Sequence, residues 1–236
     1  MADYKKPDYW QLKARKEGYP ARSVYKLQEM DEKFGLIKIT RSGAGGQGTR
    51  GIDCGARGMD CGARGMDCGA AFRALDLGAA PGSWSLYALR KMAGGGFLTA
   101  ADLSPLSRQY DKGLFSGENF FFIQGDITEP AVREAILSRG PYSLIISDAA
   151  PATTGNHSID STRSLELAEA VLAYAESGLA KGGNLAIKVF QGGDTAELLK
   201  RIKALFNTAK SFKPQACRSE SVETYYIGLG KLTPPF

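Results

Sequence analysis

The chain has 236 residues, of which 43% are hydrophobic and 23% charged, and its net charge is +5. This composition excludes wholesale disorder, and the length suits one α/β domain with additions better than two full domains. No stretch approaches the roughly 20 apolar residues that cross a bilayer, and the N-terminus lacks the apolar run of a signal peptide. We therefore expect a cytoplasmic protein, a monomer without a membrane partner, whose mildly basic charge permits an anionic partner.

The first segment, residues 1–38, is basic and helical in character, and lysines and arginines alternate in it with aromatic residues. Its apolar residues recur at helical spacing at Val24, Leu27 and Met30. Pro20 is typical of a helix opening and Gly35 of a helix end. We interpret the segment as an N-terminal extension that binds RNA, because phosphates attract cations and bases stack on aromatic rings. The alternative is an ordinary solvated helix face.

Residues 39–71 have a different composition. The heptad Gly-Met-Asp-Cys-Gly-Ala-Arg repeats almost perfectly there, and glycine costs about 1 kcal/mol per residue in a helix, so we predict a flexible insertion and not a coiled coil. Each heptad carries one cysteine, namely Cys54, Cys61 and Cys68. Zinc ligands normally stand two to four residues apart, often with histidine, so we predict no metal site.

From residue 72 to residue 236, expected strands and helices alternate. The strands are predicted at 73–77, 97–102, 120–124, 143–147, 184–190, 210–217 and 223–229. The helices are predicted at 83–92, 129–138, 161–180 and 194–207. Repeated strand–helix units indicate an α/β fold with a mostly parallel seven-stranded sheet covered by helices on both faces. The last two strands suggest a hairpin that places one antiparallel strand at or near the edge.

The loop after the first expected strand reads Gly78-Ala79-Ala80-Pro81-Gly82. Ligands of open α/β sheets bind beyond the carboxyl ends of the strands, so this loop is expected to hold a cofactor. The dinucleotide pattern G-x-G-x-x-G cradles a pyrophosphate, whereas this loop has an alanine at the second glycine and a proline inside the turn. A cofactor without phosphates, S-adenosylmethionine, fits better, and Gly78, Pro81 and Gly82 are predicted to bind it. The fold is then a Rossmann-like methyltransferase fold.

Three further residues are predicted to bind this cofactor. Asp102 ends the second strand. Its separation along the chain from the cofactor loop is close to the ~20 residues at which an acid binds the ribose hydroxyls of a cofactor, and a helix cap is the alternative. Asp126 follows the third strand, where a carboxylate accepts a hydrogen bond from an adenine amino group or caps a helix. Trp84 either borders the ligand or packs its helix onto the sheet.

Polar residues at the fourth and fifth strands complete the pattern. Asp148 follows the fourth strand, Lys188 lies within the apolar fifth strand, where a buried lysine needs partners, and Glu223 opens the last strand. With these residues in place, the sequence resembles the FtsJ family (also called RrmJ or RlmE) of ribosomal RNA 2′-O-methyltransferases. The matching stretches are 17–27, 75–85, 148–151, 188–192 and 223–230.

The resemblance implies a tetrad formed by Lys26, Asp148, Lys188 and Glu223. It also places the family's cofactor contacts on Gly82, Trp84, Asp102, Asp126 and Asp148. The implied reaction is S-adenosylmethionine-dependent methylation of a ribose 2′-oxygen in RNA, at a uridine of large-subunit ribosomal RNA, with transfer RNA as second choice. The chain departs from the family at Ser83, where the family loop usually has a second glycine.

The tetrad also has a physical rationale. Methyl transfer from a sulfonium is an in-line displacement that needs a positioned 2′-oxygen and removal of its proton, and alignment can supply roughly 7–11 kcal/mol. A lysine accepts a proton only when neutral. Lys188 is the candidate base or orienting group, Lys26 the neighbouring cation, and the two carboxylates hold the lysines. A structural ion-pair network is the alternative.

Two other functions remain open on the sequence. A nucleotide-dependent oxidoreductase is disfavoured by the loop proline and by the lysine of the fifth strand. A non-catalytic RNA-binding protein with a cofactor pocket is disfavoured by the complete tetrad. His157, the single histidine, is interpreted as an incidental residue of a polar loop near the mouth of the site.

Overall fold

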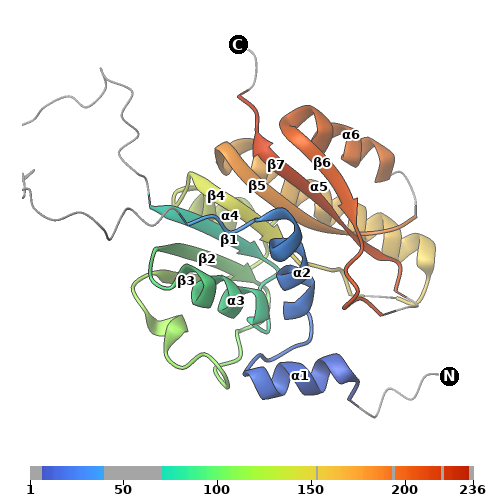
Figure 1. The fold of residues 1–236 in the computed structure, drawn as a ribbon. Helices are drawn as coiled ribbons and strands as arrows, with labels where there is room; N and C mark the ends of the chain where they lie inside the picture. The colour runs from blue at the N-terminus through green and yellow to red at the C-terminus, as the bar shows by residue number, and fades with distance from the viewer. Residues whose placement is uncertain (1–6, 40–70, 153, 193–194, 219–220, 234–236) are drawn as a thin grey trace, which may run out of the picture.

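The computed structural model describes residues 7–39, 71–152, 154–192, 195–218 and 221–233. Seven strands form a single sheet in the order β3-β2-β1-β4-β5-β7-β6 (Figure 1). The strands are β1 (Phe72–Leu77), β2 (Gly96–Asp102), β3 (Phe120–Gln124), β4 (Tyr142–Ser147), β5 (Leu179–Phe190), β6 (Phe206–Phe212) and β7 (Glu223–Lys231). β7 runs antiparallel to both of its neighbours, one place in from the edge, and this confirms the predicted fold class.

Helices cover both faces of the sheet (Figure 1). One face carries α1 (Tyr9–Glu17), α2 (Val24–Phe34) and α3 (Ser83–Met92), and the other carries α4 (Pro130–Leu137), α5 (His157–Gly178) and α6 (Thr195–Leu205). A short 3-10 helix, η2 (Leu114–Ser116), precedes β3. No helix among the described residues is long and apolar enough to span a membrane.

The N-terminal helices are built into the core. Val24, Leu27 and Met30 are fully buried and pack in one cluster with residues of α3 and the sheet, as their helical spacing predicted. α2 ends at Gly35, which takes the left-handed conformation that glycine favours. Pro20 lies in the turn before α2 and does not open the helix. The described part of the 1–38 segment is therefore packed against the sheet and α3, while the repeat with its cysteines lies outside the described residues.

The predicted strand at 210–217 is wrong in its second half. β6 begins directly after α6, because Phe206 is buried against Gly228 of β7, and it ends at Phe212. The following loop is tied to α2, since the Glu29 carboxylate accepts the backbone N–H groups of Gln215 (2.7 Å) and Ala216 (2.9 Å). These bonds bring the loop that precedes Glu223 onto the helix that carries Lys26.

Candidate active site

The loop after β1 has a shape that only glycine allows at its first position. Gly78 has a φ of +77°, and a Cβ there would lie 2.5 Å from the Cα of Ala149. The loop after β1 therefore touches the loop after β4. Gly82 closes the turn by donating its N–H to the carbonyl of Ala79 (2.7 Å), and it lies against the ring of Phe115. This contact between two strand ends sets one wall of the site.

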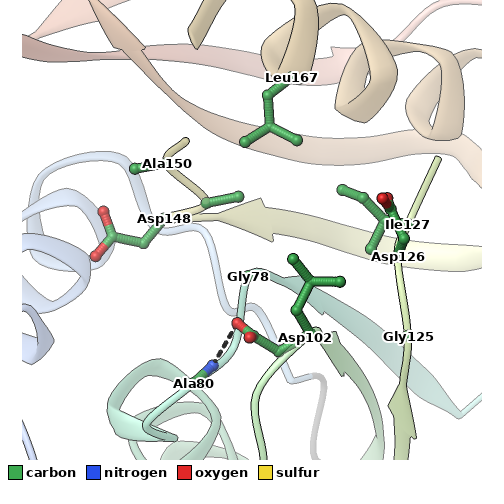
Figure 2. A pocket seen from close by; sticks show the side chains of 11 residues that line it. Gly78, Ala80, Asp102, Gly125, Asp126, Ile127, Asp148, Ala150 and Leu167 are labelled. Carbon is green, nitrogen blue, oxygen red and sulfur yellow. Dashed lines mark hydrogen bonds between the residues drawn. The ribbon is translucent and has the colours of Figure 1, made fainter. Parts of the chain in front are cut away.

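A pocket of about 320 Å³ opens at the carboxyl ends of the parallel strands (Figure 2). It is lined by Gly78, Ala80, Asp102, Leu103, Gly125, Asp126, Ile127, Asp148, Ala149, Ala150 and Leu167. This lining holds three carboxylates and several apolar side chains, and neither a lysine nor an arginine. The arrangement suits a ligand with cationic and hydroxyl groups better than one with phosphates.

Two of the three carboxylates are fixed by backbone groups. Asp102 accepts the N–H of Ala80 (2.9 Å; Figure 2) and that of Ser104 (2.8 Å). Asp126 uses one oxygen, Oδ1, to accept the N–H (2.8 Å) and the hydroxyl (2.7 Å) of Thr128, and these bonds lower its pKa. Its other oxygen has no hydrogen-bond partner among the described residues. Asp126 thus caps a turn and still offers an acceptor toward the pocket.

Three residues predicted to bind the cofactor lie outside the lining of this pocket. Gly82 is buried under Phe115, and Pro81 is exposed, with its carbonyl accepting the N–H of Ser107 (3.0 Å). Trp84 is 2% exposed, and its Nε1–H donates to the carbonyl of Ser23 (2.8 Å). The structure therefore shows the packing role that the sequence left open for Trp84, and a contact of these residues with a cofactor stays a prediction.

The four tetrad residues meet beside the pocket, although they come from four separate parts of the chain. The Nζ of Lys26, on α2, lies 2.7 Å from Oε1 of Glu223 at the start of β7 and 3.9 Å from Oδ1 of Asp148. The Nζ of Lys188, on β5, donates to Oδ1 (3.1 Å) and to the carbonyl (2.9 Å) of Asp148. Asp148 is the one member that also lines the pocket.

The charges of the tetrad stabilise one another. Burial by itself lowers the pKa of Lys26, but the carboxylates of Asp148 and Glu223 outweigh it, so the pKa is raised above its usual value. Burial raises the pKa of Asp148, and the ammonium groups of Lys188 and Lys26 reverse this, so the pKa is lowered. Lys26 is accordingly a cation and Asp148 an anion at neutral pH.

Two residues of this cluster were missed by the sequence reasoning. The Tyr225 hydroxyl donates to Oδ1 of Asp148 (2.6 Å), and burial raises its pKa well above the usual value, so it remains a neutral donor. Its position two residues after Glu223, on the same face of β7, was the available signal. Cys217 lies beside Glu223. Its burial, and to a smaller extent the negative charge of Glu223, raises the pKa of its thiol to about 12. No sequence pattern marked it.

His157 begins α5 and is exposed, and a Cβ on Gly192 would lie 2.9 Å from its imidazole ring. It therefore borders the loop after β5, outside the lining of the pocket. Within the described ranges, no three histidine, cysteine or acidic side chains gather as metal ligands do.

Asp76, the last residue but one of β1, is fully buried beneath the cofactor loop. Its Oδ2 accepts the hydroxyl of Ser85 (2.6 Å), while Oδ1 has no hydrogen-bond partner in the part of the chain that the structure describes. Burial raises the pKa of Asp76 from 3.8 to about 7. The folded protein therefore keeps this proton across a range of pH in which the unfolded chain has released it.

We expect the free energy of unfolding to fall as the pH rises from about 4 to about 7, because only the unfolded chain gains from ionising Asp76. The slope of this contribution approaches about 1.4 kcal/mol per pH unit, which is the value expected when unfolding releases one proton. The substitution Asp76→Asn should remove it. Urea unfolding of both proteins across this range measures the difference, and equal slopes would contradict a protonated Asp76.

Comparisons with known proteins show the family to which the chain belongs. The model of the FtsJ-like methyltransferase family matches residues 19–231. The ribosomal RNA large subunit methyltransferase E of Treponema denticola is 44% identical over 96% of both chains. The chain belongs to the FtsJ-like methyltransferase family.

A second relative and a solved structure are also similar to this chain. The enzyme of the same name from Oleidesulfovibrio alaskensis is 40% identical, over 94% of this chain and 91% of that one. The crystal structure of a protein described as a ribosomal RNA methyltransferase, from Plasmodium falciparum, shares the fold with a TM-score of 0.65. It is 23% identical and covers 91% of this chain and 99% of that one. The family match includes every residue of the tetrad.

Proposed function

We propose that the chain transfers a methyl group from S-adenosylmethionine to the 2′-oxygen of a ribose in large-subunit ribosomal RNA. The names of the two relatives support this substrate, and the tetrad supports a hydroxyl as the methyl acceptor. The observation that carries the proposal is the double position of Asp148, which lines the pocket and also binds Lys188. A methyl group held in the pocket and an oxygen held by the tetrad would meet at this residue.

The lining of the pocket fits S-adenosylmethionine. Asp102 and Asp126 present acceptors for ribose hydroxyls and an adenine amino group, and Leu103, Ile127 and Leu167 offer apolar surface for a base. The Asp148 carboxylate would face cationic groups of the cofactor. When bound, the cofactor supplies a methyl group on a positively charged sulfur.

The tetrad then acts on the acceptor ribose. As an ammonium group Lys188 orients the 2′-hydroxyl, and in its neutral form it takes the proton; its two hydrogen bonds to Asp148 fix the position of its Nζ. The cationic Lys26 favours the oxyanion that develops as the proton leaves. Glu223 holds Lys26 in place at 2.7 Å.

The monomeric state and the cytoplasmic location of the protein stay predictions from the sequence.

A methyl-transfer assay tests the proposal against its rivals. Tritiated S-adenosylmethionine is supplied with separate pools of ribosomal and transfer RNA, and the labelled nucleotide is mapped. Label on a ribose of large-subunit ribosomal RNA is expected. Label on transfer RNA alone would favour the second substrate, and binding of RNA without transfer would favour a non-catalytic protein. Calorimetry with S-adenosylmethionine and with NAD separates a methyltransferase from an oxidoreductase.

The basic N-terminal segment is proposed to bind RNA, and α1 carries two of its exposed cations, Arg15 and Lys16. Trimming the first 16 residues is a poor test, because Ala14 is in the core and Asp8 pairs with Arg22. We expect Arg15→Glu combined with Lys16→Glu to weaken RNA binding about tenfold or more at low salt and to flatten its salt dependence.

Filter binding at several salt concentrations measures this effect. The charge-matched control is Lys181→Glu with Lys203→Glu, two exposed lysines of β5 and α6. Equal losses in both double variants would show that net charge, and not α1, determines RNA affinity.

A further inference from the structure

The segment that leads to Lys26 depends on α3 for its position. α2 begins at Val24, and its N-cap residue Ser23 makes no side-chain capping bond. The carbonyl of Ser23 accepts the backbone N–H of Lys26 (3.0 Å). The backbone N–H groups of Val24, Tyr25 and Lys26 each donate to the carbonyl three residues earlier, so the first turn of α2 is closed by backbone bonds and lacks only a side-chain cap. The lysine that it carries must reach Glu223 across the fold.

The first two residues of α3 add side-chain hydrogen bonds to the segment that leads into this turn. The Oγ of Ser83 accepts the N–H of Ala21 (2.9 Å) and lies 3.2 Å from the carbonyl of the same residue, to which it can donate. The indole N–H of Trp84 donates to the carbonyl of Ser23 (2.8 Å). Ser83 is 1% exposed, so water cannot replace its hydroxyl without a local rearrangement.

Ser83 also follows directly on the cofactor loop, since Gly82 is the N-cap residue of α3. One end of the loop is thus joined through Ser83 to the segment that positions Lys26.

We propose that Ser83 is a positioning residue for Lys26, whose hydroxyl fixes the start of α2 relative to the cofactor loop. This inference rests on the proposed methyl-transfer function. Without the hydroxyl, the N–H of Ala21 loses its buried partner and the carbonyl of Ala21 keeps only the long bond from Val24 (3.5 Å), so the start of α2 is held less firmly. A small displacement there separates the Lys26 ammonium from Glu223 and from the reacting oxygen.

A double-mutant cycle tests whether Ser83 acts through Lys26. We expect Ser83→Ala to lower kcat about tenfold and to leave the Kd for S-adenosylmethionine within twofold of wild type. Lys26→Arg keeps the positive charge but changes the length and shape of the side chain that carries it. The kcat of the double variant should be no more than about twofold below that of the slower single variant. Losses that multiply, or a raised cofactor Kd with unchanged kcat, would overturn the proposal.

Hydrogen exchange supplies a measurement that needs no activity. Amide exchange in residues 19–27 should accelerate in Ser83→Ala. The matched control is Ser85→Ala, a buried serine of the same helix whose hydroxyl bonds Asp76 on β1 instead. It should lower the melting temperature without accelerating exchange in residues 19–27. Equal acceleration in both variants, or none in Ser83→Ala, would refute the link.

The two experiments also separate this proposal from the proposed function. A folded wild-type chain that fails to methylate ribosomal RNA would count against the function alone, and the exchange measurement then decides the role of Ser83. Active wild type with multiplicative losses would count against Ser83 alone.

Discussion

Replacing Lys188 with alanine is expected to lower the rate of methyl transfer by about 10²–10⁴-fold, the range typical of a lost general acid or base. Lys188 is 9% exposed and donates to both the side chain and the carbonyl of Asp148 beside the pocket. The Kd for S-adenosylmethionine should change little, since Lys188 is outside the lining of the pocket. Single-turnover assays and calorimetry measure the two quantities.

Two further variants control this result. Lys188→Met keeps most of the side-chain volume and should be as inactive as Lys188→Ala, which excludes a simple packing defect. Lys181→Ala removes an exposed lysine of the same strand and should retain turnover. Near-normal turnover in Lys188→Ala would show that the tetrad is a structural ion-pair network.

The substitution Gly78→Ala is expected to weaken cofactor binding at least tenfold and to destabilise the protein. The positive φ of Gly78 costs other residues roughly 1–2 kcal/mol. The added methyl group would also lie 2.5 Å from Cα and Cβ of Ala149, so the loops after β1 and β4 must separate. Because both loops line the pocket, its shape changes with them.

Gly94→Ala is the matched control. Gly94 has a similar φ of +82°, and a Cβ there would meet nothing within 4 Å. It should show the conformational cost alone, as a lower melting temperature with an unchanged cofactor Kd. If the two variants had the same cofactor Kd, the contact between Gly78 and Ala149 would have no part in binding.

The order of strands and helices was predictable because it rests on local patterns. The expected helix at 83–92 coincides with α3, since its apolar residues and flanking glycines carry the signal within a single segment. β6 was misplaced because its start depends on Phe206 packing against Gly228, a contact between distant residues.

The candidate site was predictable to a similar extent. Its tetrad was assigned through the family resemblance, and the structure brings these four residues together. The role of Tyr225 depends on the direction of its side chain, and the role of Ser83 depends on the contact between α3 and the segment before α2. The spacing of residues along the chain encodes neither. Leu167 lines the pocket from the middle of α5 for the same reason.

The position of β7 has a consequence for synthesis of the protein. Glu223, which binds Lys26, lies 197 residues further along the chain, on β7. β7 also pairs with β5 on one side and β6 on the other, so β6 can join the sheet only when β7 has arrived. A nascent chain therefore has its cofactor loop early, but the cluster of Lys26, Asp148, Lys188 and Glu223 can be complete only after β7 has been synthesised.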